Sequence, residues 1–254
     1  MNSPYEPSAT LKAKLTRRLV PFRARRDLHF KLTRPVVSFT FDDFPRSAIT
    51  GGSDQLEAED WRATFYVSAG LAELENHHGQ HFKASDLQAL MKRGHEIGGH
   101  TFTHIDCEAL SSEDVIAEID RNKIALQAMG VPNIAHFAYP FGASSAPLKQ
   151  ALQGRFKTMR GITPGAHRHK ADLNGLLSAP IFSGHKLDTT LRLIEGLKSR
   201  PAWLTLFAHD IREKPSEWGC TPAEFSAAIK AVKDSGALVL PIGEAVDYLE
   251  AHHG

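Results

Sequence analysis

The sequence contains few cysteines and no long hydrophobic run. Of its 254 residues only two are cysteines, Cys107 and Cys220, and their wide separation argues against a disulfide framework. The longest apolar runs are far shorter than the roughly 18–20 residues needed to span a bilayer. The amino-terminal residues also lack the apolar segment of a secretory signal peptide. We therefore expect a soluble, cytoplasmic protein.

Several nucleotide- and nucleic-acid-binding patterns are missing as well. The sequence has no GxGxxG and no GxxxxGKS or GxxxxGKT stretch, which argues against a glycine-rich phosphate loop. Beyond residue 34 it has no basic stripe, no RNP-like aromatic cluster and no zinc-finger spacing. We expect no nucleic acid among the partners of this protein.

The net charge of +1 hides an asymmetry along the chain. Residues 1–34 carry nine Lys and Arg against two acidic residues, and the remainder carries 21 basic and 27 acidic residues. We predict a basic arm over residues 1–35 and a body over residues 36–254. Three roles are open for the arm: peripheral contact of residues 12–34 with an anionic membrane, a solvated segment, or packing on the body. The oligomeric state is not indicated.

Short apolar runs alternate with helical patterns from residue 35 onward. Strands are predicted at 36–41, 63–67, 96–99, 134–139, 156–161, 203–208 and 237–240. Helix starts are predicted at Ser85, at Ser111 or Ser112, and at Thr221, where Pro222 and Glu224 complete the signal. Alternating strands and helices predict an α/β protein with a parallel sheet. Without a phosphate loop, a single-domain barrel is favoured over an open sheet.

Two adjacent carboxylates, Asp42 and Asp43, follow the first predicted strand directly. Neighbouring residues at a strand end point in different directions, so one carboxylate can bind a metal while the other stays free. Asp43 as a simple turn cap before Pro45 is the structural alternative. The strand-end position favours chemistry, because polar groups after strand ends form the active sites of α/β barrels.

The stretch Gly98-Gly99-His100-Thr-Phe-Thr-His104 supplies two histidines four residues apart. On a helical turn both imidazoles would lie on one side, suited to one divalent ion. With Asp43 they form a set that leaves positions open for water and substrate. Zinc would activate a water for hydrolysis with Asp42 as general base, whereas iron would suit an oxygenase. Cys107 is interpreted as a buried apolar residue rather than a fourth ligand.

Two further segments end predicted strands. His209 follows 203–208 and is placed to protonate an amine leaving group, while Asp210 either orients it or caps the next turn. The segment Tyr139-Pro140-Phe141-Gly142 either offers backbone N–H groups to an oxyanion or is a loop packed on the core.

These residues resemble the polysaccharide deacetylase family, the NodB-homology domain of carbohydrate esterase family 4. The TFDD stretch at 40–43, the HTFTH stretch at 100–104, the YPFG stretch at 139–142 and the FAH stretch at 207–209 are similar in order and spacing to its motifs. The resemblance covers roughly residues 36–245. It implies a distorted (β/α)7 barrel and metal-dependent removal of an acetyl group from a sugar.

The resemblance also implies a role for each matching residue. Asp43, His100 and His104 would hold the metal, usually zinc. Asp42 would be the base and His209 the acid. The backbone N–H of Phe141 would stabilise the oxyanion, with Tyr139 and Pro140 beside it.

The sequence departs from the family pattern in two places. The arginine that usually begins the third motif and braces the catalytic aspartate is replaced by Ala138, and its usual Asp-Trp partner is not visible in 173–182. Arg160 is either a replacement brace or a surface or structural ion-pair residue. The basic segment 164–170 either grips an anionic or extended substrate or is an insertion loop.

We therefore predict a hydrolase that acts on the carbon–nitrogen bond of an N-acetylated sugar, a polysaccharide or a glycan precursor. Two alternatives are open. One is a deformylase or ring-amide hydrolase on the same barrel. The other is a glycan-binding module without catalytic activity, suggested by Ala138.

Overall fold

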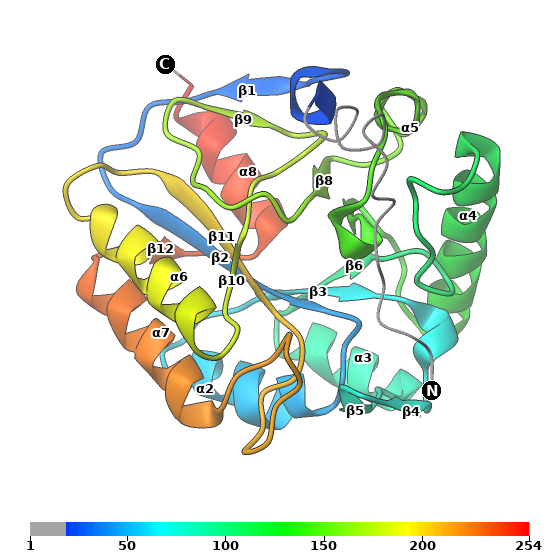
Figure 1. Ribbon diagram of the computed structural model, residues 1–254, viewed down its shortest axis with the longest axis horizontal. Helices are drawn as coiled ribbons and strands as arrows, with labels where there is room; N and C mark the ends of the chain where they lie inside the picture. Colours follow the sequence, from blue (N-terminus) through cyan, green and yellow to red (C-terminus); the bar gives the residue numbers. More distant parts are fainter. Residues whose placement is uncertain (1–18, 254) are drawn as a thin grey trace.

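Short strands that are apolar on both faces form the centre of the molecule (Figure 1). In the computed structural model, which describes residues 19–253, one parallel sheet has the order β10-β11-β2-β3-β6-β7-β8, and β12 also pairs with β2. Its strands are β2 (Val36–Asp42), β3 (Thr64–Val67), β6 (Glu96–Gly99), β7 (His136–Ala138), β8 (Thr158–Arg160), β10 (Ala179–Pro180), β11 (Trp203–Ala208) and β12 (Leu238–Val239). All seven predicted strands are present. Four are shorter than predicted, at 63–67, 134–139, 156–161 and 237–240, and the strand predicted at 36–41 extends to Asp42.

The sheet curls toward closure between its two outer strands. Arg160 at the end of β8 pairs with Leu176, and the N–H of Gly161 donates to the Leu176 carbonyl at 3.0 Å, just before β10 begins. The architecture is the distorted α/β barrel of a single domain, as predicted. Curling brings the carboxyl ends of strands distant in sequence to one rim, where α/β barrels carry their chemistry.

Helices cover the outside of this sheet (Figure 1). They are α2 (Asp54–Glu57), α3 (Ala84–Lys92), α4 (Ser112–Ala128), α5 (Ala146–Ala151), α6 (His185–Gly196), α7 (Pro222–Asp234) and α8 (Ile242–Ala251), with shorter turns η1 (Val20–Phe22), η2 (Ile49–Ser53), η3 (Ala69–Leu71) and η4 (Pro140–Gly142). None of the helices within residues 19–253 is long and apolar enough to cross a membrane.

Two predicted helix starts are confirmed and one is wrong. The Thr221 hydroxyl accepts from the Glu224 N–H, and the Glu224 carboxylate accepts from the Thr221 N–H. Ser111 caps α4 with its hydroxyl, which accepts from the Asp114 N–H at 3.1 Å and donates to the Asp114 carboxylate at 2.8 Å. The helix assigned to Ser85 instead begins at Ala84, because Asp86 reaches back to the backbone N–H of Lys83 and fixes that residue as the cap.

The described part of the predicted basic arm packs on the barrel. Strand β1 (Asp27–His29) pairs antiparallel with β9 (Lys170–Asp172), and Leu28 and Phe30 are buried. Apolar side chains at these two positions bury surface that a solvated arm would expose. A boundary at residue 35 therefore does not separate this segment from the body. Residues 1–18 of the predicted arm lie outside the described residues, and membrane contact through 12–34 stays a prediction.

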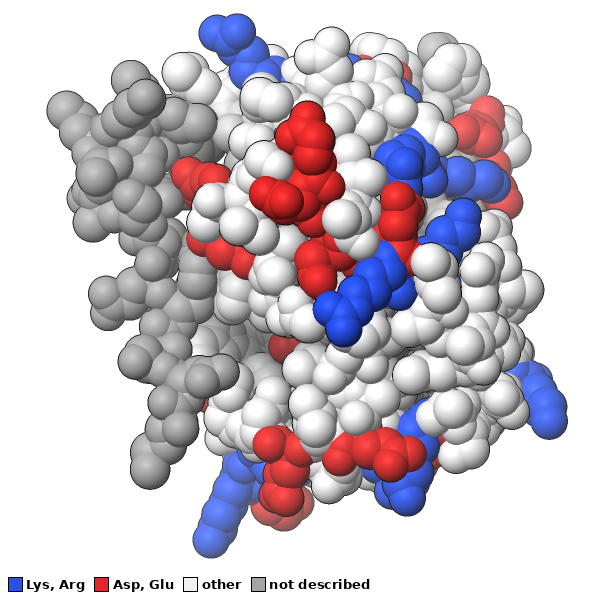
Figure 2. All heavy atoms as spheres, turned by 90° about the vertical axis from the view of Figure 1, so that its right-hand side faces the viewer, with Lys and Arg blue, Asp and Glu red and all other residues white. Residues whose placement is uncertain are grey.

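Charges of both signs are interspersed on the face of the molecule that carries α4 (Figure 2). Among the described residues of the amino-terminal segment, basic groups bind neighbouring parts of the chain. Arg25 pairs with Asp27, Arg26 donates to backbone carbonyls at 156 and 157, and Arg34 donates to the Gly236 carbonyl. The absence of a nucleic-acid partner stays a prediction.

Candidate metal-dependent active site

Strand ends gather the predicted site residues at one rim of the barrel. Asp42 is the last residue of β2, and the register of β2 with β11 pairs Phe41 with Ala208, so His209 follows beside Asp42. His100 comes directly after β6. Parallel strands place these carboxyl ends side by side, which is why residues far apart in sequence meet here.

Asp43 is presented by a three-residue turn. The Phe44 N–H donates to the Asp42 carbonyl at 2.6 Å, and Asp43 and Phe44 have φ values of 60° and 64°. Left-handed backbone is costly for residues other than glycine and persists where the surroundings hold it. The Phe44 ring is buried against Phe65 and Phe82, with ring centroids 4.9 and 5.1 Å apart. This packing holds the turn and aims the Asp43 carboxylate inward.

His100 and His104 come together, but not on a helical turn as predicted. Residues 100–105 form an irregular loop in which Thr101 and His104 have φ values of 58° and 54°. The loop brings the two rings to a centroid distance of 4.9 Å. The Nδ1–H of His100 donates to the Ala138 carbonyl at 2.8 Å, which leaves its Nε2 as the ligating nitrogen.

Asp43, His100 and His104 have the geometry of a divalent-metal site. Asp43 Oδ1 lies 3.5 Å from His100 Nε2 and 3.2 Å from His104 Nε2. This oxygen is buried and has no hydrogen-bond partner. Burial lowers the pKa of His104 to about 4, so its ring is neutral near pH 7. A buried carboxylate oxygen that faces two imidazole nitrogens fits a cation.

Asp42 is held by Arg160. The guanidinium Nη2 donates to Asp42 Oδ1 at 2.5 Å and also to Oδ2, while Nη1 donates to the Gly161 carbonyl at 2.9 Å. Both side chains are almost completely buried. Of the two roles left open for Arg160, the structure shows the brace. The arginine missing at Ala138 is thus replaced from the neighbouring strand β8.

Aromatic rings and a glycine position this arginine. The guanidinium lies over the rings of Tyr66 and Phe207, 5.1 and 4.9 Å from their centroids. A Cβ at Gly98 would meet the Tyr66 ring at 2.5 Å, so only glycine leaves room for the ring. Gly98 therefore affects the site through packing: it leaves room for the Tyr66 ring, which packs on Arg160, and Arg160 holds Asp42.

His209 is half-buried at the opposite side of Asp43. Its Nδ1–H donates to the Trp218 carbonyl at 3.1 Å, which leaves Nε2 free to exchange a proton. Burial first, and then the neighbouring His78 ring, lower the pKa of His209 to about 4. Asp210 does not orient His209. Its carboxylate instead accepts from His78, Arg212 and Ser216.

His78 belongs to the site and was not identified from the sequence. It lies in the tight turn between β4 (Glu75–Asn76) and β5 (Gly79–Gln80). Its Nε2 is 3.6 Å from Asp43 Oδ2, and its ring stacks on His209 with centroids 4.8 Å apart. Strands of two residues carry almost no hydrophobic periodicity, so the pattern around His78 indicates only a turn.

The YPFG segment divides between the site and the core. The Phe141 ring lies edge-on to His104 at a centroid distance of 4.4 Å, and Phe141 has a φ of 57° inside η4. Pro140 is buried. Tyr139 is a core residue rather than a substrate contact, because its ring is buried against Phe137 and its hydroxyl faces Met159 Sδ at 3.0 Å. The oxyanion role of the Phe141 N–H stays a prediction.

Two other predicted features are structural. Cys107 is buried, and burial raises the pKa of its thiol to about 12, which fits an apolar core residue. In the basic loop 164–170, His167 is buried against Trp203 and accepts the Leu177 N–H at 3.0 Å, and Arg168 donates to the Arg200 carbonyl. This loop is anchored to the barrel by its own side chains.

The fold and the Asp-His-His set define a metal-binding α/β barrel. Residues 30–154 match the polysaccharide deacetylase family, and the chain belongs to that family. The chain is 30% identical over 111 residues to chitin deacetylase 1 of Saccharomyces cerevisiae. That match covers 42% of this chain but only 32% of the yeast protein.

Solved structures share the whole fold. A chitin deacetylase from the fungal pathogen Colletotrichum lindemuthianum superposes with a TM-score of 0.60 over 85% of this chain and 89% of its own, at 18% identity. A CE4 family pseudoenzyme from Bacillus anthracis superposes with a TM-score of 0.58 over 84% of this chain and 65% of its own, at 16% identity. The fold alone therefore does not distinguish an active deacetylase from an inactive relative.

Proposed function

We propose that the protein is a zinc-dependent deacetylase that removes the acetyl group from an N-acetylated sugar, either in a polysaccharide or in a glycan precursor. The observation that supports this best is that two neighbouring carboxylates have different partners. Asp43 faces two imidazoles with an unpartnered oxygen, while Asp42 beside it is paired with Arg160. One is suited to hold an ion and the other to move a proton.

The bound ion would supply an acidified water and positive charge for the developing oxyanion. Asp42 would accept a proton as the general base. Arg160 fixes the direction of the Asp42 carboxylate through hydrogen bonds to both of its oxygens. Since both residues are buried, the Asp42 oxygens are already oriented before substrate arrives.

His209 gives a proton to the leaving nitrogen from the other side of Asp43. Its Nε2 is the free nitrogen, because Nδ1 is bonded to the Trp218 carbonyl. The pKa of about 4 means that the imidazole is neutral at rest near pH 7 and must take up a proton before it can donate one. Once protonated, such a group is a stronger acid than an ordinary histidine.

The test is acetate release from an N-acetylated chitooligosaccharide by protein loaded with one equivalent of zinc. We expect turnover in the wild type and a loss of about 10²–10⁴-fold in Asp42→Asn, with zinc content unchanged. Asp60→Asn is the matched control, since the Asp60 side chain is 96% exposed. Formate release or ring opening from amide substrates in place of acetate would assign the site to the alternative hydrolases.

Sugar binding without turnover, unchanged by a chelator, would favour a binding module. The intact Asp42–Arg160 pair argues against that alternative, because it restores the brace that Ala138 removes. Zinc is preferred to iron since hydrolysis needs no redox change. The cytoplasmic location stays a prediction.

A further inference from the structure

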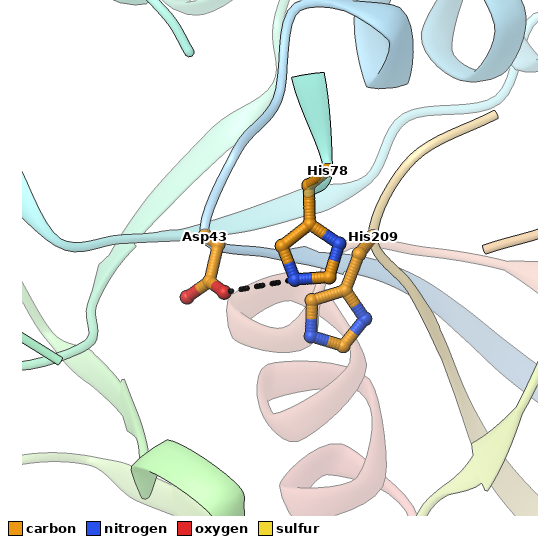
Figure 3. A group of neighbouring side chains, drawn as sticks. All are labelled: Asp43, His78 and His209. Carbon is orange, nitrogen blue, oxygen red and sulfur yellow. Dashed lines mark ion pairs between the residues drawn. The ribbon is translucent and has the colours of Figure 1, made fainter. Parts of the chain in front are cut away.

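Asp43 has a second carboxylate oxygen, and a second pair of histidines faces it (Figure 3). Oδ1 is directed at His100 and His104, whereas Oδ2 lies 3.6 Å from His78 Nε2. One ligand atom each from Asp43, His78 and His209 lie within 4.8 Å of one another. The two triads therefore share only the aspartate.

Both histidines of this second triad are oriented as metal ligands are. The Nδ1–H of His78 donates to Asp210 Oδ1 at 3.2 Å, and Asp210 is itself fixed by the Ser216 hydroxyl at 2.6 Å and by Arg212 Nε at 2.8 Å. A carboxylate on the far nitrogen fixes the tautomer and makes the near nitrogen a better ligand. The Trp218 carbonyl does the same for His209.

The contact between His78 and Asp43 is not a hydrogen bond. A separation of 3.6 Å is beyond hydrogen-bond range. Because Nδ1 donates to Asp210, Nε2 is the ring nitrogen that faces the Asp43 carboxylate oxygen. Both side chains are at least nine-tenths buried. Two facing lone pairs away from water are repulsive unless a cation lies between them.

We propose that Asp43, His78 and His209 form a second divalent-metal position, bridged to the first through the Asp43 carboxylate. Asp43 Oδ2 lies 3.6 Å from His78 Nε2, farther than Oδ1 lies from either nitrogen of the first position, so the second position binds more weakly. An ion there occupies the nitrogen of His209. Resting on the proposed function, this means that excess metal blocks the acid and inhibits turnover.

The test is a Co²⁺ titration of metal-free full-length protein, followed by equilibrium dialysis and by visible absorption. We expect two equivalents in the wild type, the second weaker, and one in His78→Gln. The matched control His77→Gln changes the adjacent exposed ring and keeps both equivalents. His100→Gln loses the tight equivalent. These binding readouts do not depend on deacetylase activity.

A single equivalent in the wild type overturns the proposal. Two equivalents in His78→Gln overturn it as well. Retention of the tight equivalent in His78→Gln shows that the variant is folded. If the variant does not fold, the wild-type titration alone decides between one equivalent and two. Failure of acetate release with one bound ion, in a protein that takes up two, would refute the proposed function and leave this site standing.

Discussion

Asp42 and Asp43 are neighbours in the chain, and the structure compensates their charges in different ways. Asp42 receives its counter-charge from within the protein, as Arg160 bonds both of its oxygens. Asp43 is surrounded by imidazoles, and its Oδ1 has no hydrogen-bond partner. The first carboxylate is complete in the folded chain, and the second is completed by an ion. This difference separates a base from a metal ligand at adjacent positions.

The largest effect is expected when the charge of Asp43, the carboxylate completed by an ion, is removed. Asp43→Asn is expected to lose tightly bound zinc and to lower acetate release by at least about 10⁴-fold, the upper end for one acid–base group, because water activation is lost too. Metal content by mass spectrometry and turnover by acetate assay measure both effects. Retained zinc in this variant would contradict the ligand assignment.

The other half of the comparison is tested on Arg160. Arg160→Gln leaves the buried Asp42 charge without its partner, which should lower the free energy of unfolding by about 3–5 kcal/mol. Urea denaturation measures the loss. The loss should be equally large with and without zinc, because this pair does not depend on the ion. Arg121→Gln is the control, since its side chain is 62% exposed.

A third prediction concerns the loss of folding stability in acid. It separates the contribution of the histidines around Asp43 from that of a buried histidine elsewhere in the fold. Burial lowers the pKa of His167 to about 4, against about 6.5 in the unfolded chain. Between these two pH values the unfolded chain therefore binds more protons than the folded chain. The contribution of His167 to the free energy of unfolding is complete above pH 6.5, and about 3 kcal/mol of it is lost by pH 4.

The measurement is the free energy of unfolding of metal-free protein between pH 7 and 4. His167→Gln should lower stability at pH 7 and flatten part of the slope. An unchanged slope would show that the histidines around Asp43 account for all of the acid sensitivity.

The smallest expected effect concerns the residues that surround Asp43. Ser216→Ala removes a hydroxyl that bonds Asp210 at 2.6 Å and lies 3.1 Å from His78 Nδ1. Loss of such a supporting contact should weaken the second metal equivalent about 10–100-fold and leave the tight one unchanged. Isothermal titration with Co²⁺ compares it with Ser199→Ala, an exposed serine. Equal weakening of both equivalents would mean that the two positions are not distinct.

Much of the barrel and most residues of the site were predictable from the sequence. Buried parallel strands are continuous apolar runs, and the ligands that follow them directly, Asp43 and His100, are visible at the strand ends. His104 was predicted to lie beside His100 on a helical turn. The two rings do lie side by side, but in a loop with left-handed backbone at Thr101 and His104. The spacing of two residues constrains whether their side chains meet more than it constrains the backbone conformation between them.

The rest depends on tertiary contacts without a local signal. Arg160 becomes the brace only because β8 lies beside β7 in the curled sheet. His78 reaches Asp43 from a two-residue hairpin strand, and Asp210 turns toward His78 rather than His209. Strand β9 was not predicted, since it is only three residues long and its partner β1 lies in the segment predicted as a basic arm.

The most direct test of the account is anomalous diffraction at the zinc edge from crystals of the protein loaded with one equivalent of zinc. We predict one peak, within about 2.0–2.2 Å of Asp43 Oδ1, His100 Nε2 and His104 Nε2, with Asp42 still paired to Arg160. A peak bound to Asp42, or one that lies between His78 and His209 while the His100 and His104 side is empty, would contradict the division of roles between the two carboxylates.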